Sequence, residues 1–343
     1  MSETDTQRRT VAVIGAGAWG TTLAWLLGNQ GHRVRLWTRR PEHAEQIRRE
    51  GENRSRLPGT VLPPQVLATG DLREALRGAE CVVSAVPSAH LREVAGRMAG
   101  LLDPEALVVS ATKGLEPGTG KRMSQLLAEE AQVRPGRVVA LSGPNLSGEI
   151  AAGMPAVSVV AGSEESGVAE GQRLLSSPLF RIYANYDILG VEICGALKNV
   201  LAIAAGVSDG LGYGANARAA LVTRGLTEMG RIGHALGACR ATFWGAAGVG
   251  DVLTTCNSRL SRNWQAGYRL GCGKALTAEA GEVSEAIEGV PTTGAARELA
   301  QRLGVEAPIS CALYEVLFEG RAPGEAVMEL MCRPWRAEAE AWQ

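Results

Sequence analysis

Short apolar runs alternate with helix-like stretches along the first half of the chain. The runs are rich in valine, leucine and isoleucine, whereas the stretches between them place apolar residues at three- and four-residue intervals. This alternation is typical of a doubly wound, mainly parallel sheet with right-handed crossovers, as in a Rossmann-like α/β domain. The predicted strands are 11–14, 34–37, 81–86, 107–111, 137–141, 156–161 and 180–184, and the helices between them include 20–29, 41–50, 89–102 and 120–131.

The pattern changes after about residue 187. Segments 188–211, 219–236 and 294–304 keep the helical spacing and contain no convincing strand. We therefore expect two domains, a dinucleotide-binding α/β domain over 1–187 and an all-helical domain over 188–343. No linker separates them, and the charged tail from about residue 333 is expected to fray.

Composition narrows the class of protein. A chain of 343 residues exceeds the usual size of a single hydrophobic core, which agrees with two domains. Lys and Arg number 35 against 36 Asp and Glu, so no net field draws the chain to nucleic acid or to an anionic membrane. The seven cysteines form no C-x-x-C pair, and no ligand-spaced cluster predicts a metal site. Without a signal-like start or a run of about twenty apolar residues, a cytoplasmic protein with no membrane span is expected.

A glycine-rich turn directly follows the first predicted strand. Gly15, Gly17 and Gly20 form the pattern G-x-G-x-x-G between a strand and a helix. The first glycine permits a tight turn, the second lets the backbone approach a pyrophosphate, and the third allows close packing of helix on strand. In this position the pattern predicts a bound dinucleotide, with the helix amides facing the phosphates.

The end of the second strand bears on the choice of cofactor. A site that prefers NAD holds the ribose 2′-hydroxyl with an acidic residue here, but the chain has Thr38, Arg39 and Arg40. Guanidinium groups favour a 2′-phosphate, so the sequence predicts that NADPH is accepted, with NADH as an alternative. The other interpretation is that one of the arginines is merely a solvated charge.

Polar residues follow three later strands, where ligands of such sheets bind, and the first of them is Ser88, after strand 81–86. Lys113 comes after strand 107–111, and Gly143 and Asn145 come after strand 137–141. Lys113 places a cation in the expected crevice, although a surface lysine is the simpler reading of an isolated residue. Asn145 is equally compatible with a plain helix N-cap.

The helical half adds a lysine, an aspartate and a polar triplet. Lys198 lies inside an otherwise apolar helix, where desolvation favours proton exchange near neutral pH, although a lysine can also extend to the surface. Asp251 and the triplet Ser261, Arg262 and Asn263 at a predicted helix start offer a grip for a phosphorylated substrate. The four histidines lack a comparable setting: they are His32, His43, His90 and His234.

Together these motifs resemble the bacterial NAD(P)-dependent glycerol-3-phosphate dehydrogenases over about residues 10–330. The resemblance rests on Gly15–Gly20, Ala111–Glu116, Leu141–Asn145, Gly195–Val200, Gly214–Arg218, Gly248–Asp251, Ser261–Asn263 and Glu288–Gly289. It implies reversible reduction of dihydroxyacetone phosphate to sn-glycerol 3-phosphate for glycerophospholipid synthesis, in a homodimer.

The resemblance also implies residue roles. Lys198 is the expected proton donor and acceptor. The expected substrate-binding residues are Lys113, Gly143, Asn145, Lys198, Asp251, Ser261, Arg262 and Asn263. The expected cofactor-binding residues are Gly15, Gly17, Ala18, Trp19, Gly20, Arg39, Arg40, Lys113, Ser147, Arg262 and Glu288. Two positions depart from the family pattern, since Ser or Thr is frequent where Asn145 stands and Ala is usual where Ser147 stands.

Two alternatives stay open from the residues alone. A β-hydroxyacid or ketopantoate-type reductase pairs the same kinds of domain with a lysine but acts on carboxylates. A non-catalytic protein that senses dinucleotides would need no intact set of polar residues.

Overall fold

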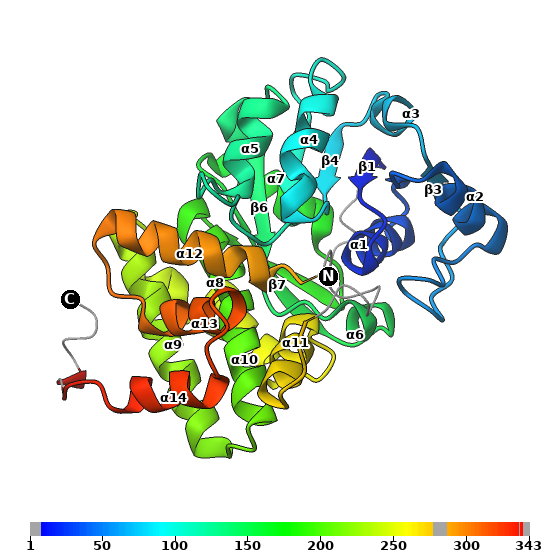
Figure 1. The fold of residues 1–343 in the computed structure, drawn as a ribbon. Coiled ribbons are helices and arrows are strands. Elements are labelled where there is room, and N and C mark those ends of the chain that lie inside the picture. The colour runs from blue at the N-terminus through cyan, green and yellow to red at the C-terminus, as the bar shows by residue number, and fades with distance from the viewer. Residues whose placement is uncertain (1–7, 277–286, 336, 339–343) are drawn as a thin grey trace.

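The computed structural model describes residues 8–276, 287–335 and 337–338. The first part of the chain forms an eight-stranded sheet in the order β3-β2-β1-β4-β5-β6-β7-β8 (Figure 1). All neighbouring strands are parallel except β6 and β7, so the mainly parallel, doubly wound sheet is confirmed. The strands are β1 (Thr10–Ile14), β2 (Arg33–Trp37), β3 (Val66–Thr69), β4 (Cys81–Ser84), β5 (Leu107–Ser110), β6 (Val138–Ser142), β7 (Ala156–Ala161) and β8 (Phe180–Asn185).

Strand β3 was not expected from the sequence. It is four residues long, lies at the edge of the sheet and pairs only with β2. Its Leu67 side chain is half exposed, so the segment lacks the continuous apolar character of the central strands. A short edge strand needs little hydrophobic pattern, which explains why the prediction missed it.

Helices cover both faces of the sheet. Residues of α1, α2 and α7 pack on one face with Val11 and Val13, and residues of α3, α4 and α5 pack on the other with Ala12 and Ile14. The two faces of β1 are therefore both buried. The helices of this part are α1 (Ala18–Asn29), α2 (Pro41–Glu50), α3 (Leu72–Leu76), α4 (Ser88–Met98), α5 (Met123–Glu130), α6 (Ser147–Ala151) and α7 (Glu165–Leu175).

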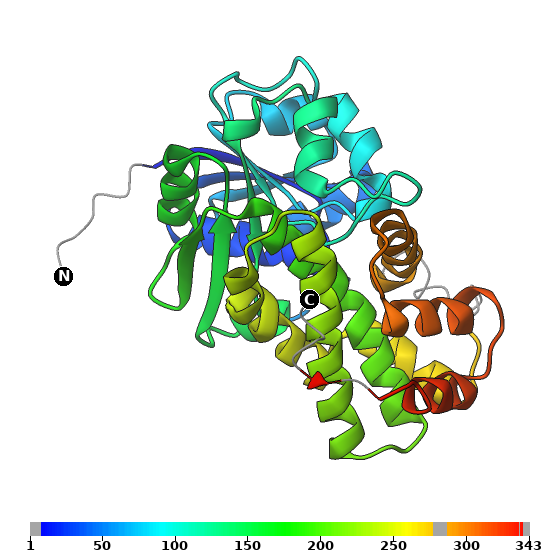
Figure 2. The ribbon, with the colours of Figure 1, turned by 90° about the vertical axis from the view of Figure 1, so that its left-hand side faces the viewer.

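Among the described residues no strand follows β8, and the regular structure of this part is helical, as predicted. Figure 2 shows the long helices of this part extending away from the sheet. Asp187 caps the first of them by accepting a hydrogen bond from the Gly190 amide. The helices are α8 (Ile188–Gly210), α9 (Ala215–Ala235), α10 (Asp251–Asn257), α11 (Arg262–Gly271), α12 (Gly289–Leu303), α13 (Pro308–Phe318) and α14 (Pro323–Met331).

Helix α8 is the centre of the helical part. Among the described residues it is the one helix long and apolar enough to cross a membrane by length and composition. Glu192, Lys198 and Asp209 interrupt its sequence, so it is not a continuous run of about twenty apolar residues. In addition, 78% of its most apolar window is buried inside the protein, against α9, α10, α11 and α12. Its apolar composition is that of a core helix. The tail predicted to fray from about residue 333 lies largely outside the described residues.

Candidate active site

The glycine-rich turn has the geometry that a dinucleotide pyrophosphate needs. Gly15 has a φ of +114°, and a Cβ there would lie 2.7 Å from the Ala85 carbonyl oxygen. A Cβ at Gly20 would lie 1.8 Å from the Gly15 carbonyl oxygen, so only glycine lets α1 start this close to β1. Gly17, by contrast, is exposed and has nothing within 4 Å of the same position. The space over Gly17 fits a phosphate group, and α1 begins there with free amides.

The neighbouring cofactor candidates lie around this turn. Ala18 and Trp19 are the first residues of α1, and the Trp19 ring packs edge-on against Phe180 with centroids 6.3 Å apart. Its side chain therefore belongs to the packing, which leaves its backbone amide for the ligand. Ser147 begins α6, and its carbonyl oxygen lies 3.4 Å from the Thr22 hydroxyl of α1. Arg39 and Arg40 are exposed after β2, at the same edge of the sheet.

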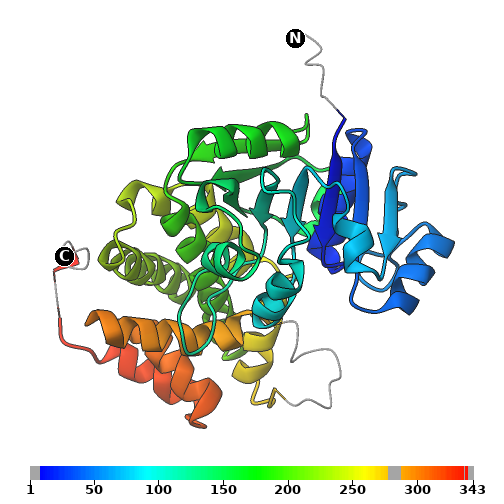
Figure 3. The same cartoon turned by 90° about the horizontal axis from the view of Figure 1, so that it is seen from above.

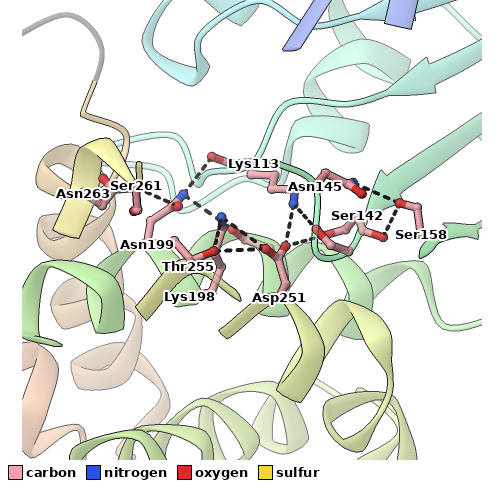
Figure 4. Close-up of polar contacts among 12 residues, drawn as sticks. Lys113, Ser142, Asn145, Ser158, Lys198, Asn199, Asp251, Thr255, Ser261 and Asn263 are labelled. Carbon is pink, nitrogen blue, oxygen red and sulfur yellow. Dashed lines mark hydrogen bonds and ion pairs between the residues drawn. The ribbon is translucent and has the colours of Figure 1, made fainter. Parts of the chain in front are cut away.

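Two lysines meet one aspartate at the carboxyl edge of β5 and β6 (Figure 4). Lys113 follows β5, Lys198 lies in the middle of α8, and Asp251 opens α10 after a π-helical turn at Ala246–Gly250. The Lys113 Nζ lies 2.5 Å from Asp251 Oδ2, and the Lys198 Nζ lies 3.2 Å from Asp251 Oδ1. Lys198 is 9% exposed and Asp251 1%. The structure thus buries the predicted lysine and gives it a carboxylate partner.

Burial and charge act against each other in this cluster. Burial lowers the pKa of the Lys113 ammonium to about 8, although the Asp251 carboxylate opposes this shift, while the second ammonium, at Lys198, adds to it. Burial on its own would raise the pKa of Asp251, but the two ammonium groups lower it below its usual value. One carboxylate therefore serves two cations, and a net positive charge faces the crevice. Such a site suits an anionic substrate.

Hydrogen bonds extend the cluster along α8 and α10 and into one further helix, α11. The Lys198 Nζ donates to Thr255 Oγ1 at 2.9 Å, and the Thr255 hydroxyl lies 3.2 Å from Asp251 Oδ1. Asn199 donates to the Lys113 carbonyl oxygen at 3.4 Å and accepts from the Asn263 amide at 2.9 Å. These hydrogen bonds therefore fix the position of the lysine cluster relative to the start of α11.

The β6–α6 loop closes the other side of the cluster. The Gly143 carbonyl oxygen accepts from the Lys113 Nζ at 2.8 Å, and a Cβ on Gly143 would lie 2.9 Å from the Ser158 Cα. Asn145 donates to the Ser158 hydroxyl at 3.0 Å, which in turn donates to the Ser142 carbonyl oxygen at 2.8 Å. The buried Oδ1 of Asn145 has no protein partner among the described residues. The interpretation of Asn145 as a helix N-cap was wrong, because Leu146 is the N-cap of α6 and the Asn145 side chain is held by Ser158 of β7 instead.

The start of α11 and the start of α4 face the same crevice. The Ser261 hydroxyl caps α11 by accepting from the Trp264 amide at 3.3 Å, which leaves its own proton free. Arg262 is exposed and interacts electrostatically with Glu288, whose carboxylate accepts from the Ser88 amide at 3.0 Å and from the Ser88 hydroxyl. Ser88 begins α4, and the Ala85 carbonyl two residues before Pro87 abuts Gly15. Arg262 therefore lies on the side of the glycine-rich turn.

The predicted residues are thus brought together in large part. Lys113, Gly143, Lys198 and Asp251 are in direct contact, and Asn263 joins them through Asn199. Arg39 and Arg40 lie apart, after β2. Analysis of the sequence assigned no site role to Thr255, Asn199, Ser142, Ser158 and Ser88. Ser88 and Ser142 do follow predicted strands, and Thr255 lies four residues after Asp251 on one helix. No group of three or more His, Cys, Asp or Glu within the described residues has a metal-binding arrangement.

Comparisons with known proteins follow the same division of the chain. Family models described as the N-terminus and C-terminus of NAD-dependent glycerol-3-phosphate dehydrogenase match residues 10–168 and 187–328. A protein of Geobacillus thermodenitrificans named glycerol-3-phosphate dehydrogenase (NAD(P)+) is 47% identical over 329 residues, 96% of each chain. One of Moorella thermoacetica with the same name is 46% identical over 334 residues, 97% of this chain and 99% of the other. A crystal structure of glycerol-3-phosphate dehydrogenase from Coxiella burnetii superposes with a TM-score of 0.91 at 38% identity, covering 95% of this chain and 99% of that one.

Proposed function

The chain belongs to the family of NAD-dependent glycerol-3-phosphate dehydrogenases, and from this premise we propose how its residues share the reaction. It is an NAD(P)-dependent oxidoreductase that interconverts dihydroxyacetone phosphate and sn-glycerol 3-phosphate, the precursor of glycerophospholipids. In the reductive direction, C2 of the ketone gains a hydride and its oxygen gains a proton. The bound nicotinamide cofactor supplies the hydride, and the protein must supply the proton.

Lys198 supplies that proton. Its ammonium is buried against the Thr255 hydroxyl and the Asp251 carboxylate, which fix the position of Nζ. An N–H bond of the ammonium breaks as the O–H bond of the new alcohol forms, and the reverse transfer occurs in oxidation. A positioned acid of this kind contributes about 10²–10⁴-fold to the rate. The Lys113 ammonium stabilises the oxyanion and keeps its own charge through Asp251.

The start of α11 holds the phosphate. Ser261 has a free hydroxyl proton, Arg262 supplies a guanidinium and Asn263 is anchored by Asn199. Charge-assisted hydrogen bonds at a helix start are strong enough to orient a small phosphorylated substrate. Gly143 and Asn145 line the opposite wall, beside Lys113.

The glycine-rich turn would hold the dinucleotide. Gly17, Ala18 and Trp19 would offer backbone amides to its phosphates, while Gly15 and Gly20 give the turn its shape. Ser147, Glu288, Arg262 and Lys113 would line the path to the nicotinamide. Arg39 and Arg40 bind a ribose 2′-phosphate, so NADPH is preferred over NADH. Comparing the KM for NADPH and for NADH in the double variant Arg39→Ala/Arg40→Ala tests this preference, which should disappear if these arginines create it.

The contact of Lys198 with Asp251 and Thr255 is the observation that supports the mechanism most directly, and Lys198→Ala tests it. The variant should lose about 10²–10⁴-fold in turnover of dihydroxyacetone phosphate while still quenching NADPH fluorescence with wild-type affinity. Turnover within tenfold of wild type would remove Lys198 from the proton transfer.

Substrate choice separates this reaction from that of a β-hydroxyacid or ketopantoate-type reductase. Purified protein should oxidise NADPH with dihydroxyacetone phosphate and not with 2-keto acids. A protein that binds dinucleotides without catalysis would oxidise NADPH with neither.

The same proposal includes the domain boundary, the cellular location and the oligomeric state. The domain boundary lies at residue 187, where Asp187 caps α8. The protein acts in the cytoplasm as a homodimer formed through its helical domain, and light scattering of the purified chain at micromolar concentration tests the oligomeric state.

A further inference from the structure

A buried polar chain connects the glycine-rich turn to the end of β2. Asn53, in the loop after α2, donates from one Nδ2 to the Ala16 carbonyl oxygen at 2.9 Å and to Thr21 Oγ1 at 2.8 Å. Its Oδ1 lies 3.0 Å from Nε2 of His43, on α2, and the His43 Nδ1 lies 3.2 Å from the Thr38 hydroxyl. Asn53, His43 and Thr38 are all buried. Figures 1 and 3 show α1, α2 and β3 at this edge of the sheet, away from the helical domain.

The donors and acceptors of this chain are fixed by its chemistry. Asn53 Oδ1 only accepts, so His43 Nε2 must carry a hydrogen and donate. In the neutral ring Nδ1 is then an acceptor, and the Thr38 hydroxyl donates to it. Ser55 supplies a second hydrogen bond to Asn53 Oδ1 at 3.2 Å. All four hydrogen-bonding positions of the Asn53 amide are therefore used, which leaves the side chain one orientation.

The consequence lies in the peptide between Ala16 and Gly17. A trans peptide is planar and directs its C=O and N–H to opposite sides. Holding the Ala16 carbonyl against Asn53 therefore directs the Gly17 N–H away from the protein interior. Gly17 is the exposed glycine whose surroundings are open, where the phosphate fits. The orientation of Asn53 thus sets the orientation of a phosphate-binding amide.

We propose that Asn53 and His43 are positioning residues for cofactor binding: His43 orients the Asn53 amide, and Asn53 orients the Ala16–Gly17 peptide toward the dinucleotide pyrophosphate. This inference rests on the proposed function. Neither residue touches the ligand. Because NADPH and NADH carry the same pyrophosphate, the effect is the same for both cofactors.

Variants of His43 test the first step. His43→Leu fills the space but cannot donate, so the KM for NADPH and for NADH should each rise about threefold to tenfold, as one lost hydrogen bond predicts. The KM for dihydroxyacetone phosphate and kcat should change less than twofold. His43→Gln keeps an N–H near the position of Nε2 and should restore the wild-type KM. An unchanged cofactor KM in His43→Leu would overturn the proposal.

Asn53→Asp tests the second step, because it replaces the donor facing the Ala16 carbonyl with an oxygen. We expect the KM for both cofactors to rise about tenfold or more. If Asn53→Asp does not fold, His43→Leu and His43→Gln still decide the question.

A second buried histidine gives a matched control. His32, at the opposite end of β2, accepts from the Arg9 amide at 3.2 Å and touches none of the proposed cofactor residues. His32→Leu should lower the melting temperature without changing the cofactor KM. Equal changes of cofactor KM in His32→Leu and His43→Leu would assign the effect to general destabilisation and reject the proposal.

Binding measured without substrate separates this inference from the proposed function. Fluorescence titration with NADPH alone measures the affinity of the glycine-rich turn for the cofactor, even if the protein does not reduce dihydroxyacetone phosphate. Wild-type binding without turnover would contradict the proposed function only, whereas wild-type affinity in His43→Leu would contradict only the positioning role.

Discussion

The glycine-rich turn (Gly15–Gly20) and the lysine cluster (Lys113, Lys198 and Asp251) differ in the groups that they offer a ligand. The turn lies within six consecutive residues, and what it offers a ligand is backbone, shaped by glycines at Gly15, Gly17 and Gly20. The cluster uses side chains, and its closest ion pair joins Lys113 to Asp251 across 138 positions of the chain. The turn depends on the space that its glycines leave open, and the cluster depends on charged side chains that the fold must bring together.

Substitutions should therefore act differently in the two regions. A side chain added to the glycine-rich turn causes a steric clash and weakens cofactor binding. A substitution that removes one charge from the buried cluster leaves a cation without its partner, at the full cost of desolvation. Substitutions in the turn should therefore raise the KM for the cofactor, whereas substitutions in the cluster should lower kcat/KM for the substrate.

After the loss of Lys198 itself, the largest effect is expected at Asp251, the shared partner of two buried ammonium groups. Asp251→Asn leaves both lysines without a counter-charge, so kcat/KM for dihydroxyacetone phosphate should fall about 10²–10³-fold. NADPH affinity, measured by fluorescence, should change little. Asp209→Asn is the control, since Asp209 pairs with Arg218 at 2.6 Å and with the Trp264 indole at 2.7 Å, outside the cluster. Equal losses in both variants would point to stability instead of chemistry.

The glycines give the next largest effect and the opposite signature. At Gly20 a methyl group would lie 1.8 Å from a backbone oxygen, so Gly20→Ala must shift α1 and should weaken NADPH binding about 100-fold. At Gly17 the methyl group meets only the space reserved for phosphate, so Gly17→Ala should fold normally and bind about tenfold more weakly. Melting temperature and NADPH titration distinguish the two. A normal melting temperature for Gly20→Ala would contradict the steric account.

The same difference explains what the sequence could predict. The turn, seven of the eight strands and the helical second half follow from local patterns, because a period of apolar residues or a G-x-G-x-x-G turn is complete within one element. Strand β3 escaped prediction because it has only four residues and a half-exposed Leu67, whereas the other edge strand, β8, has six residues. For Lys113, Lys198 and Asp251 the residue type in its local setting was a sufficient clue.

Their supporting residues gave no such clue. Thr255 and Asn199 lie inside helices where threonine and asparagine are unremarkable, and their role appears only when α8, α10 and α11 are assembled. Analysis of the sequence assigned no role to His43, which only flanks the second strand, yet its partners Thr38 and Asn53 are five and ten positions away. A hydrogen-bond partner is a property of the fold, so a single sequence indicates the charges at the site better than the groups that orient them.

Lys113 offers a pH test of the cluster. Because burial lowers its pKa to about 8, the ammonium that attracts the substrate is lost above that pH. We expect kcat/KM for dihydroxyacetone phosphate to decline above about pH 8. Asp251 raises the Lys113 pKa, so Asp251→Asn should move this decline of kcat/KM to lower pH. Lys113→Arg should abolish the decline, since a guanidinium stays charged. An unchanged decline in Lys113→Arg would assign the titration to another group.

The smallest effect is expected at Thr255, which holds Lys198 without bearing charge. Thr255→Val keeps the shape of the side chain but removes the acceptor for the Lys198 ammonium at 2.9 Å. The Asp251 carboxylate remains 3.2 Å from the same nitrogen, so we expect kcat to fall only about threefold to tenfold, with the KM for NADPH unchanged. Thr255→Ser restores the hydroxyl and should recover most of kcat, which a loss of packing alone would not allow. If Thr255→Val keeps the wild-type kcat while Thr255→Ser loses activity, the methyl group is what matters, and the orientation of Lys198 depends on Asp251 alone.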